Sequence, residues 1–281
     1  MIQAREKIIV SFSGGQTSGF MCFFLLFNFG HLYEFIFLFA NTGEEREETL
    51  VFIDKVDKAF GLKLVWLEAV VNPKMGKGIR HKVVNFETAS RNGQPFEAFV
   101  SKSGIPNANK PQCSDRLKKL PIEDYKKTHG LRGLRHCIGI RNDEKHRKSK
   151  QGQQYNLIYP LCDWIEIDKQ DINTFWENMP FSLGIEEHQG NCKTCWKKSN
   201  PKLWLLAIEE PESFLFMARM ESQYQHVLPN KDGKPRFFFR KHRSAKDILK
   251  ESQGMNPFIL RKRIGYFKDA DSGCSESCEA Y

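Results

Sequence analysis

The stretch Ile8-Ile9-Val10-Ser11-Phe12-Ser13-Gly14-Gly15-Gln16-Thr17-Ser18-Gly19 decides the fold of this chain. Its first three residues are typical of a buried parallel strand, and Phe20 to Phe27 continue as the helix that packs back on that strand. The glycines allow a tight turn, and the N–H groups at the helix start, with the hydroxyls around them, form an anion site. The predicted phosphate ligands are Ser11, Ser13, Gly14, Gly15, Thr17 and Ser18. An ordinary helix corner capped by serine is the alternative interpretation.

Composition and charge narrow the class of protein. With 281 residues, 40% hydrophobic and 27% charged, the chain has the make-up of a globular protein. The apolar stretch from Met21 to Phe39 contains Asn28, Gly30, His31 and Glu34, which favour a helix, a turn and a strand over a membrane span. We see no secretory signal and expect a cytoplasmic protein. The net charge of +9 suits a polyanionic partner, although a solvated lysine-rich surface without such a partner would give the same net charge.

Strand and helix patterns alternate through the first half of the chain. Strands are expected at Glu34 to Ala40, Leu62 to Val70, Arg135 to Ile140 and Asn156 to Leu161, with an amphipathic helix at Glu44 to Phe60. This order predicts an α/β fold, a doubly wound and mostly parallel sheet, in residues 1–165. Residues 166–281 are predicted to be a mainly helical region whose cysteines complete a metal or cluster site. The basic segment from Asn72 to Asn92 is expected to be an irregular loop.

Two further motifs follow predicted strands, and ligands of such sheets bind beyond the carboxyl ends of the strands. Asn41, Thr42 and Gly43 are therefore predicted to lie at this ligand-binding edge, although a plain Asn/Gly turn has the same sequence pattern. Arg141 and Arg147 also follow a predicted strand, and the planar guanidinium suits an oxyanion because it can bind one through two hydrogen bonds. A solvated run of charges is the alternative.

Eight cysteines in a chain without an export signal argue against a disulfide framework. Cys22, Cys137 and Cys162 have apolar neighbours and are predicted to be core residues. The other thiols lie in polar segments, where Cys192 and Cys195 form a C-x-x-C motif. Such a pair can bind zinc or an iron–sulfur cluster, and a redox pair is the competing use. The predicted metal ligands are Cys113, Cys192, Cys195 and Cys274, with Cys278 as the alternative to Cys274.

The turn Ser13-Gly14-Gly15-Gln16-Thr17-Ser18 resembles the Ser-Gly-Gly-x-Asp-Ser signature of the PP-loop ATP pyrophosphatases (adenine nucleotide alpha-hydrolase-like superfamily), with Thr17 in place of Asp. The second motif, Asn41 to Glu45, and the segment Gly139 to Arg147 are similar to those of the phosphoadenylyl-sulfate (PAPS/APS) reductases within that superfamily. The chain most resembles short members of phage and mobile-element type. This resemblance implies an adenine nucleotide ligand, either ATP or PAPS/APS, with Asn41, Thr42 and Gly43 bordering it and Arg141 and Arg147 holding its phosphate or sulfate. Because Thr17 brings no negative charge to hold a cation, the sequence supports magnesium binding less strongly than nucleotide binding.

The cysteine segments resemble the same family. The region around Cys113 is similar to Cys-Cys-x-x-Arg-Lys-x-x-Pro, with Gln112 in place of the first cysteine, and Cys192 and Cys195 resemble the later C-x-x-C. The resemblance implies a [4Fe–4S] cluster beside the nucleotide, with zinc as the alternative. In the reductases a C-terminal cysteine attacks the sulfonucleotide, and Cys278 is the candidate for that role here.

The resemblance therefore implies a nucleotide-dependent enzyme of sulfur chemistry, similar to a phosphoadenylyl-sulfate reductase. One alternative is a PP-loop, ATP-dependent sulfurtransferase that thiolates nucleic acid, and another is a non-catalytic nucleotide-binding accessory with a structural metal. Expected partners are the nucleotide and either a nucleic acid or a protein that donates sulfur or electrons. Residues Arg236 to Lys250, which surround Phe237, Phe238 and Phe239, could stack on nucleic acid or form a buried strand.

Overall fold

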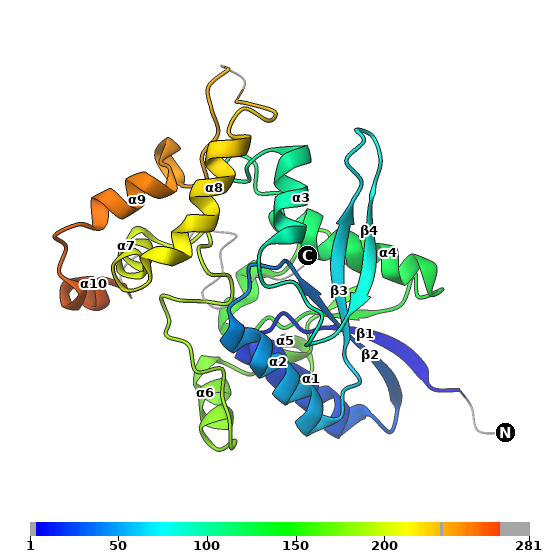
Figure 1. The fold of residues 1–281 in the computed structure, drawn as a ribbon. Helices are drawn as coiled ribbons and strands as arrows, with labels where there is room; N and C mark the ends of the chain where they lie inside the picture. The colour runs from blue at the N-terminus through cyan, green and yellow to red at the C-terminus, as the bar shows by residue number, and fades with distance from the viewer. Residues whose placement is uncertain (1–3, 231–232, 265–281) are drawn as a thin grey trace.

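The computed structural model describes residues 4–230 and 233–264. Within these residues six strands form one sheet in the order β4-β3-β2-β1-β5-β6 (Figure 1). Neighbouring strands are parallel throughout, except that β4 runs antiparallel to β3. The strands are β1 (Glu6–Ser11), β2 (Tyr33–Asn41), β3 (Val65–Val71), β4 (Ile79–Val84), β5 (His136–Cys137) and β6 (Leu157–Ile158).

The strand order reverses at β1. This central strand pairs with β2 on one side, from Glu6 opposite Tyr33 to Ser11 opposite Leu38, and with β5 on the other. Ligands of open α/β sheets bind beyond the carboxyl ends of the strands at such a switch point. The segments that follow β1 and β5 therefore border the place where a ligand is expected.

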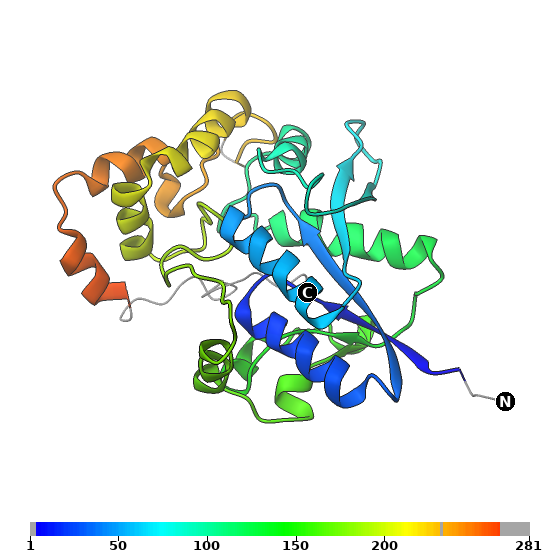
Figure 2. The ribbon, with the colours of Figure 1, turned by 60° about the horizontal axis from the view of Figure 1, so that its bottom comes forward.

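Helices cover both faces of the sheet, which confirms the predicted doubly wound, mostly parallel α/β fold (Figure 2). On one face lie α1 (Gln16–Phe29), α2 (Glu47–Phe60) and α6 (Lys169–Glu177), and on the other lies α4 (Leu120–Thr128). No helix among the described residues combines the length and apolar character needed to cross a membrane.

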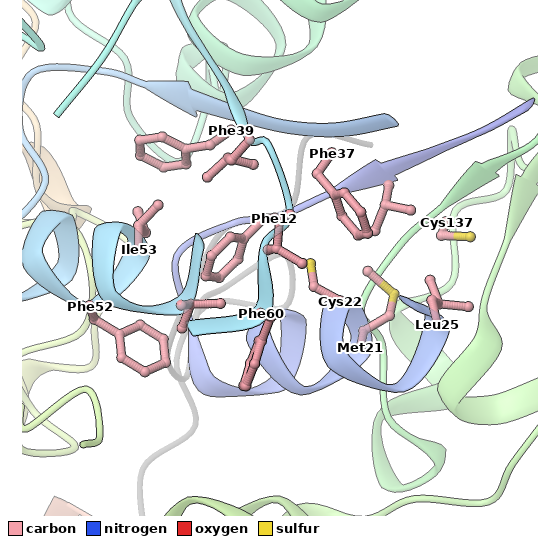
Figure 3. Packing of buried hydrophobic residues seen from close by; sticks show 14 of the residues in the cluster. Phe12, Met21, Cys22, Leu25, Phe37, Phe39, Phe52, Ile53, Phe60 and Cys137 are labelled. Atoms are coloured by element: carbon pink, nitrogen blue, oxygen red, sulfur yellow. The ribbon is translucent and has the colours of Figure 1, made fainter. Parts of the chain in front are cut away.

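Aromatic side chains fill the core between the sheet and the first helix layer (Figure 3). Phe12, just after β1, meets Phe52 of α2 edge to face, with ring centroids 6.4 Å apart. Cys22 and Cys137 are buried in the same cluster, and Cys162 is buried in a smaller one, so the prediction of three core cysteines is confirmed.

The described residues of the C-terminal part are mainly helical. Helices α7 (Asn200–Glu209), α8 (Leu215–Tyr224) and α9 (Ala245–Ser252) share a second core with α3 (Gln94–Ser103), and α10 (Pro257–Arg263) packs on α7. Phe238 and Phe239 are buried in this core, so neither ring lies on an open surface where a base could stack. The shorter elements are η1 (Asp115–Lys119), η2 (Asn142–Arg147), η3 (Gln153–Tyr155), α5 (Pro160–Asp163), η4 (Pro211–Phe214) and η5 (Arg240–His242).

The segment from Asn72 to Asn92, which we expected to be an irregular loop, contains β4. The alternation of apolar and polar residues that marks a strand is not visible here, because a histidine, His81, occupies an inward-facing position of this edge strand. His81 Nδ1 lies 2.7 Å from the Asp124 carboxylate on α4, while Arg80 and Lys82 are exposed. Charged residues are common on edge strands, where they discourage pairing with other chains.

Candidate functional site

The turn after β1 leads directly into α1. Gly14 has φ +89°, a left-handed conformation that favours glycine, and a Cβ at this residue would lie 2.9 Å from Thr49 Cγ2 on α2. Gly15 is the N-cap, and the first intrahelical bond runs from Gly19 N to Gly15 O. The N–H groups of Gln16, Thr17 and Ser18 therefore point out of the helix start, where they can bind an anion.

Two buried hydroxyls brace this turn from inside. Ser18 Oγ donates to Gly15 O over 3.0 Å and accepts from Ser13 N over 3.1 Å. Ser13 Oγ lies 2.9 Å from Ser18 Oγ. Because the only hydroxyl hydrogen of Ser18 is directed at Gly15 O, Ser13 is the donor in this pair. The serine side chains thus hold the loop in shape, and its outward backbone N–H groups face the ligand position.

Ser11, the last residue of β1, faces the neighbouring strand. Its Oγ lies 2.7 Å from Nε2 of His136 on β5. Complete burial holds the pKa of His136 well below its ordinary value, with a smaller effect of the Lys126 charge, so the imidazole is neutral. Ser11 therefore connects β1 and β5 at the switch point. No pattern in the sequence indicated His136, because its partner lies 125 residues away.

Arg141 and Thr17, two predicted ligands from distant parts of the chain, meet at the start of α1. Arg141 Nη1 donates to Thr17 Oγ1 over 2.9 Å, and Arg141 is only 4% exposed. The approach depends on Gly139, because a Cβ there would lie 3.1 Å from Ser18 Cα. The structure thus places a guanidinium beside the outward N–H groups of the helix.

Arg147 joins this group through an acidic neighbour. Glu144 Oε1 lies 2.7 Å from Arg147 Nη1 and 3.2 Å from Arg141 Nη2. Asp143 accepts from Arg141 Nε over 2.9 Å. Asp143 also accepts from Arg141 Nη2 over 3.2 Å, so these carboxylates orient both guanidinium groups and offset part of their charge.

The second motif ends β2 at the same edge of the sheet. Asn41 Nδ2 donates to Glu68 Oε1 over 2.6 Å and to Ser90 O over 2.9 Å, while Asn41 Oδ1 accepts from Gly43 N. Glu68 is fully buried on β3 and also binds Lys82 Nζ at 2.8 Å. Asn41 is therefore a fixed part of the turn, positioned by a carboxylate that sequence patterns did not single out.

Two adjacent glutamates continue this motif with different roles. Glu45 accepts from Thr42 N and from Thr42 Oγ1, each over 2.8 Å. Glu44 is buried, and this raises its pKa to about 8, opposed by the charge of Lys193 and supported by that of Glu45. Glu44 is therefore a protonated carboxyl group near neutral pH.

The C-x-x-C loop docks on both of these turns. Cys192 forms an antiparallel bridge with Glu45, and Lys193 N donates to Glu44 O over 3.0 Å. Asn191 Nδ2 donates to Ser13 O over 3.2 Å. The loop that carries Cys192 thus links the glycine turn to the second motif, and no sequence pattern indicated this role of Asn191.

Cys113 and Cys195, like Cys192, are partly buried. Cys113 comes just before η1, and Lys118 of η1 reaches back to Glu45, with Nζ 3.8 Å from Oε1. Among residues 4–230 and 233–264, no three or more Cys, His, Asp or Glu side chains are grouped so as to hold a metal ion. Cys274 and Cys278 lie outside the described residues, so the predicted ligand set and the predicted nucleophile stay predictions.

We compared the chain with known proteins by sequence and by structure. The chain matches no protein-family model. The structure of phosphoadenylyl-sulfate (PAPS) reductase from Candida auris, as a phosphate complex, aligns with 60% of this chain and 71% of that one, with TM-score 0.38 and 15% identity. The uncharacterized protein MJ0066 of Methanocaldococcus jannaschii is 23% identical over 221 residues, which are 71% of this chain and 40% of that relative.

A relative from a phage is similar over nearly its whole length. The uncharacterized nin region protein ORF290 of Escherichia phage lambda is 31% identical over 280 residues, which cover 97% of this chain and 94% of the relative. Because this identity extends along nearly the whole of both chains, the protein belongs to the family of the phage lambda nin region protein ORF290.

Proposed function

We propose that this protein is a nucleotide-dependent enzyme of sulfur chemistry that binds the phosphate or sulfate of an adenine nucleotide between Arg141 and the start of α1. The observation that carries the proposal is the hydrogen bond from Arg141 Nη1 to Thr17 Oγ1 at the switch point of the sheet. It supports an anion site because two independent sources of positive potential, a helix N-terminus and a guanidinium, converge there.

Thr17 favours an anion over a cation at this position. Arg141 already pairs with Asp143 and Glu144, so a third carboxylate at residue 17 would make this place negative, whereas a hydroxyl accepts the hydrogen bond and offsets the guanidinium charge no further. The pair is buried, so little water screens that charge. A sulfonucleotide, which needs no magnesium for its sulfur to be attacked, suits this site better than ATP cleaved with magnesium.

The C-x-x-C loop supports the sulfur part of the proposal. Its hydrogen bond to Ser13 O and its bridge to Glu45 keep Cys192 next to the proposed nucleotide edge. In a reductase, the Cys278 thiolate attacks the sulfur of the sulfonucleotide, and the nucleotide phosphate leaves. A second thiol, from a dithiol donor, then attacks Cys278 sulfur, which releases sulfite and forms a disulfide. The described residues do not assemble a metal site, and no step here uses a cluster.

One assay separates this chemistry from its alternatives. Protein purified without oxygen is incubated with labelled ATP or with a labelled sulfonucleotide plus a dithiol, and sulfite and pyrophosphate are measured. Sulfite release supports the reductase, whereas pyrophosphate release without sulfite contradicts it and favours the ATP-dependent sulfurtransferase. Tight nucleotide binding without turnover of either compound favours the non-catalytic accessory.

Two additions sharpen that assay. Cys278→Ser is expected to abolish sulfite release, while the neighbouring Ser277→Ala retains it. Iron, zinc and acid-labile sulfide are measured on the same sample. Iron with equimolar sulfide supports the [4Fe–4S] cluster, and a colourless zinc protein contradicts it.

A further inference from the structure

A strongly basic cavity lies away from the Ser11–Ser18 turn. It has a volume of about 610 Å³ and is bounded by the hairpin between β3 and β4, the end of α3 and the loop before η1. Its basic lining residues are Lys77, Lys102, Lys110, Arg116 and Arg236, and none of the described residues lining it is acidic. The volume lies in the range of ligand sites, which run from about 300 to about 1,000 Å³.

Arg236 is the buried anchor of this cavity. It is 1% exposed, and its Nη1 donates to two backbone carbonyls, Ser103 O at 3.1 Å and Ile105 O at 3.4 Å. Its Nε is buried without a hydrogen-bond partner among the described residues. Burial lowers the pKa of Arg236. A buried cation balanced only by carbonyls is costly, and an anion in the cavity would offset that cost.

The other basic groups are held around this anchor by fixed contacts. Lys102 Nζ, at the end of α3, donates to Asn72 O and Lys77 O, each over 2.7 Å, which secures the hairpin against the helix. Lys77 is exposed at the hairpin tip. Arg116 Nε lies 3.5 Å from Asp115 and has no hydrogen-bond partner among the described residues. Cations from separate segments therefore surround one hollow.

We propose that this cavity is a binding site for phosphate groups, separate from the site at Arg141. Guanidinium groups with unused N–H donors bind phosphate oxygens through charge-assisted hydrogen bonds, and the lysines at the rim add charge. The volume exceeds the needs of a bare ion, so the phosphate belongs to a larger ligand. That ligand is a free nucleotide or a single-stranded nucleic acid, and both present the same phosphate chemistry.

Binding measurements on charge variants test this site. The probes are a short fluorescein-labelled single-stranded oligodeoxynucleotide, followed by anisotropy, and ATP, followed by calorimetry. Lys77→Glu should lower the binding affinity of the probe that occupies the cavity by about tenfold, which is the effect of losing one charge-assisted hydrogen bond. Lys55→Glu, an equal charge change on an exposed residue of α2, should leave its affinity unchanged. Arg116→Gln is the second cavity variant, so the result does not depend on one substitution.

The pattern of losses identifies the source of the phosphate. A loss confined to the oligonucleotide, with a shallower dependence of affinity on salt, identifies nucleic acid. A loss confined to ATP, with Arg141→Lys acting independently, identifies a free nucleotide. Equal effects of Lys77→Glu and Lys55→Glu, or no effect of either cavity variant on either probe, overturn the proposal. Failure of the Arg141 site alone would leave the oligonucleotide result intact.

Discussion

Arg141 Nη1 donates a hydrogen bond to Thr17 Oγ1 over 2.9 Å, across 124 residues of sequence. The contact joins the segment after β5 to the helix after β1, the two elements that flank the switch point of the sheet. It brings two separately predicted ligands, Arg141 and Thr17, next to each other.

Arg141→Lys tests the guanidinium at this site. Lysine keeps the charge but lacks the planar fork that bonds Asp143 through Nε and Nη2 and Thr17 through Nη1, so nucleotide affinity should fall by about tenfold to a hundredfold, the range for one or two charge-assisted hydrogen bonds. Affinity is measured by calorimetry. Arg135→Lys is the matched control. Arg135 immediately precedes β5, and its side chain pairs with the exposed Glu6 at the start of β1. Equal losses in the two variants would remove Arg141 from the site.

Thr17→Asp tests the effect of charge at the same position. The new carboxylate should pair with Arg141 and weaken nucleotide binding about tenfold in metal-free buffer. Magnesium should restore part of that affinity, because the carboxylate can now hold a cation beside the phosphates. Thr17→Ser, which keeps the hydroxyl, should bind as the wild type does. Unchanged affinity of Thr17→Asp without magnesium would argue against an anion at this place.

Gly14→Ala tests the shape of the turn. The substitution forces alanine into a left-handed conformation and places its Cβ 2.9 Å from Thr49 Cγ2, so unfolding free energy should fall by about 2–4 kcal/mol. Gly61→Ala is the matched control, since Gly61 is also left-handed but has open space around it, and it should cost about 1 kcal/mol. Urea denaturation measures both. Similar costs would mean that the Thr49 contact relaxes freely.

Glu44→Gln tests the buried carboxyl group of the second motif. The pKa of Glu44 is raised from about 4.5 to about 8 in the folded protein, so the folded state holds a proton that the unfolded state releases in that range. Stability should therefore fall as pH rises from about 4.5 to about 8 and then level off. Glu44→Gln should remove that decline and stabilise the protein by about 2 kcal/mol at alkaline pH.

Urea denaturation across this pH range checks the prediction. Glu34→Gln is the control, because Glu34 is half exposed and pairs with Lys7 on the surface. If the unfolding free energy of Glu44→Gln still falls with pH as in the wild type, another titrating group causes the decline.

Glu68→Gln tests the carboxylate that positions Asn41. Glu68 accepts from Asn41 Nδ2, Ser90 N and Ser90 Oγ at 2.5–2.9 Å, and an amide would turn a donor toward one of these donors. The expected cost is about 3 kcal/mol in unfolding free energy, with weaker nucleotide binding at temperatures where the variant is folded. Glu48→Gln, on the exposed side of α2, should change neither quantity. Normal nucleotide affinity in folded Glu68→Gln would separate Asn41 from the ligand.

The sequence by itself determined the fold class and the position of the first turn. Ile8 to Val10, Gly14 and the helix after them are local features, in which hydrophobic periodicity and glycine conformation act within a few residues. The same local reasoning missed β4, because His81 holds its inward position through Asp124, a partner on another element.

Only the tertiary structure decided which distant groups meet. Strand order brings β5 beside β1, and this juxtaposition places His136 against Ser11 and Arg141 against Thr17. The docking of Asn191 on Ser13 and the burial of Arg236 likewise depend on contacts between segments far apart in the chain. Such contacts leave no local periodicity, because they arise from how whole layers pack, so the sequence supplied the ligand types and the fold arranged them.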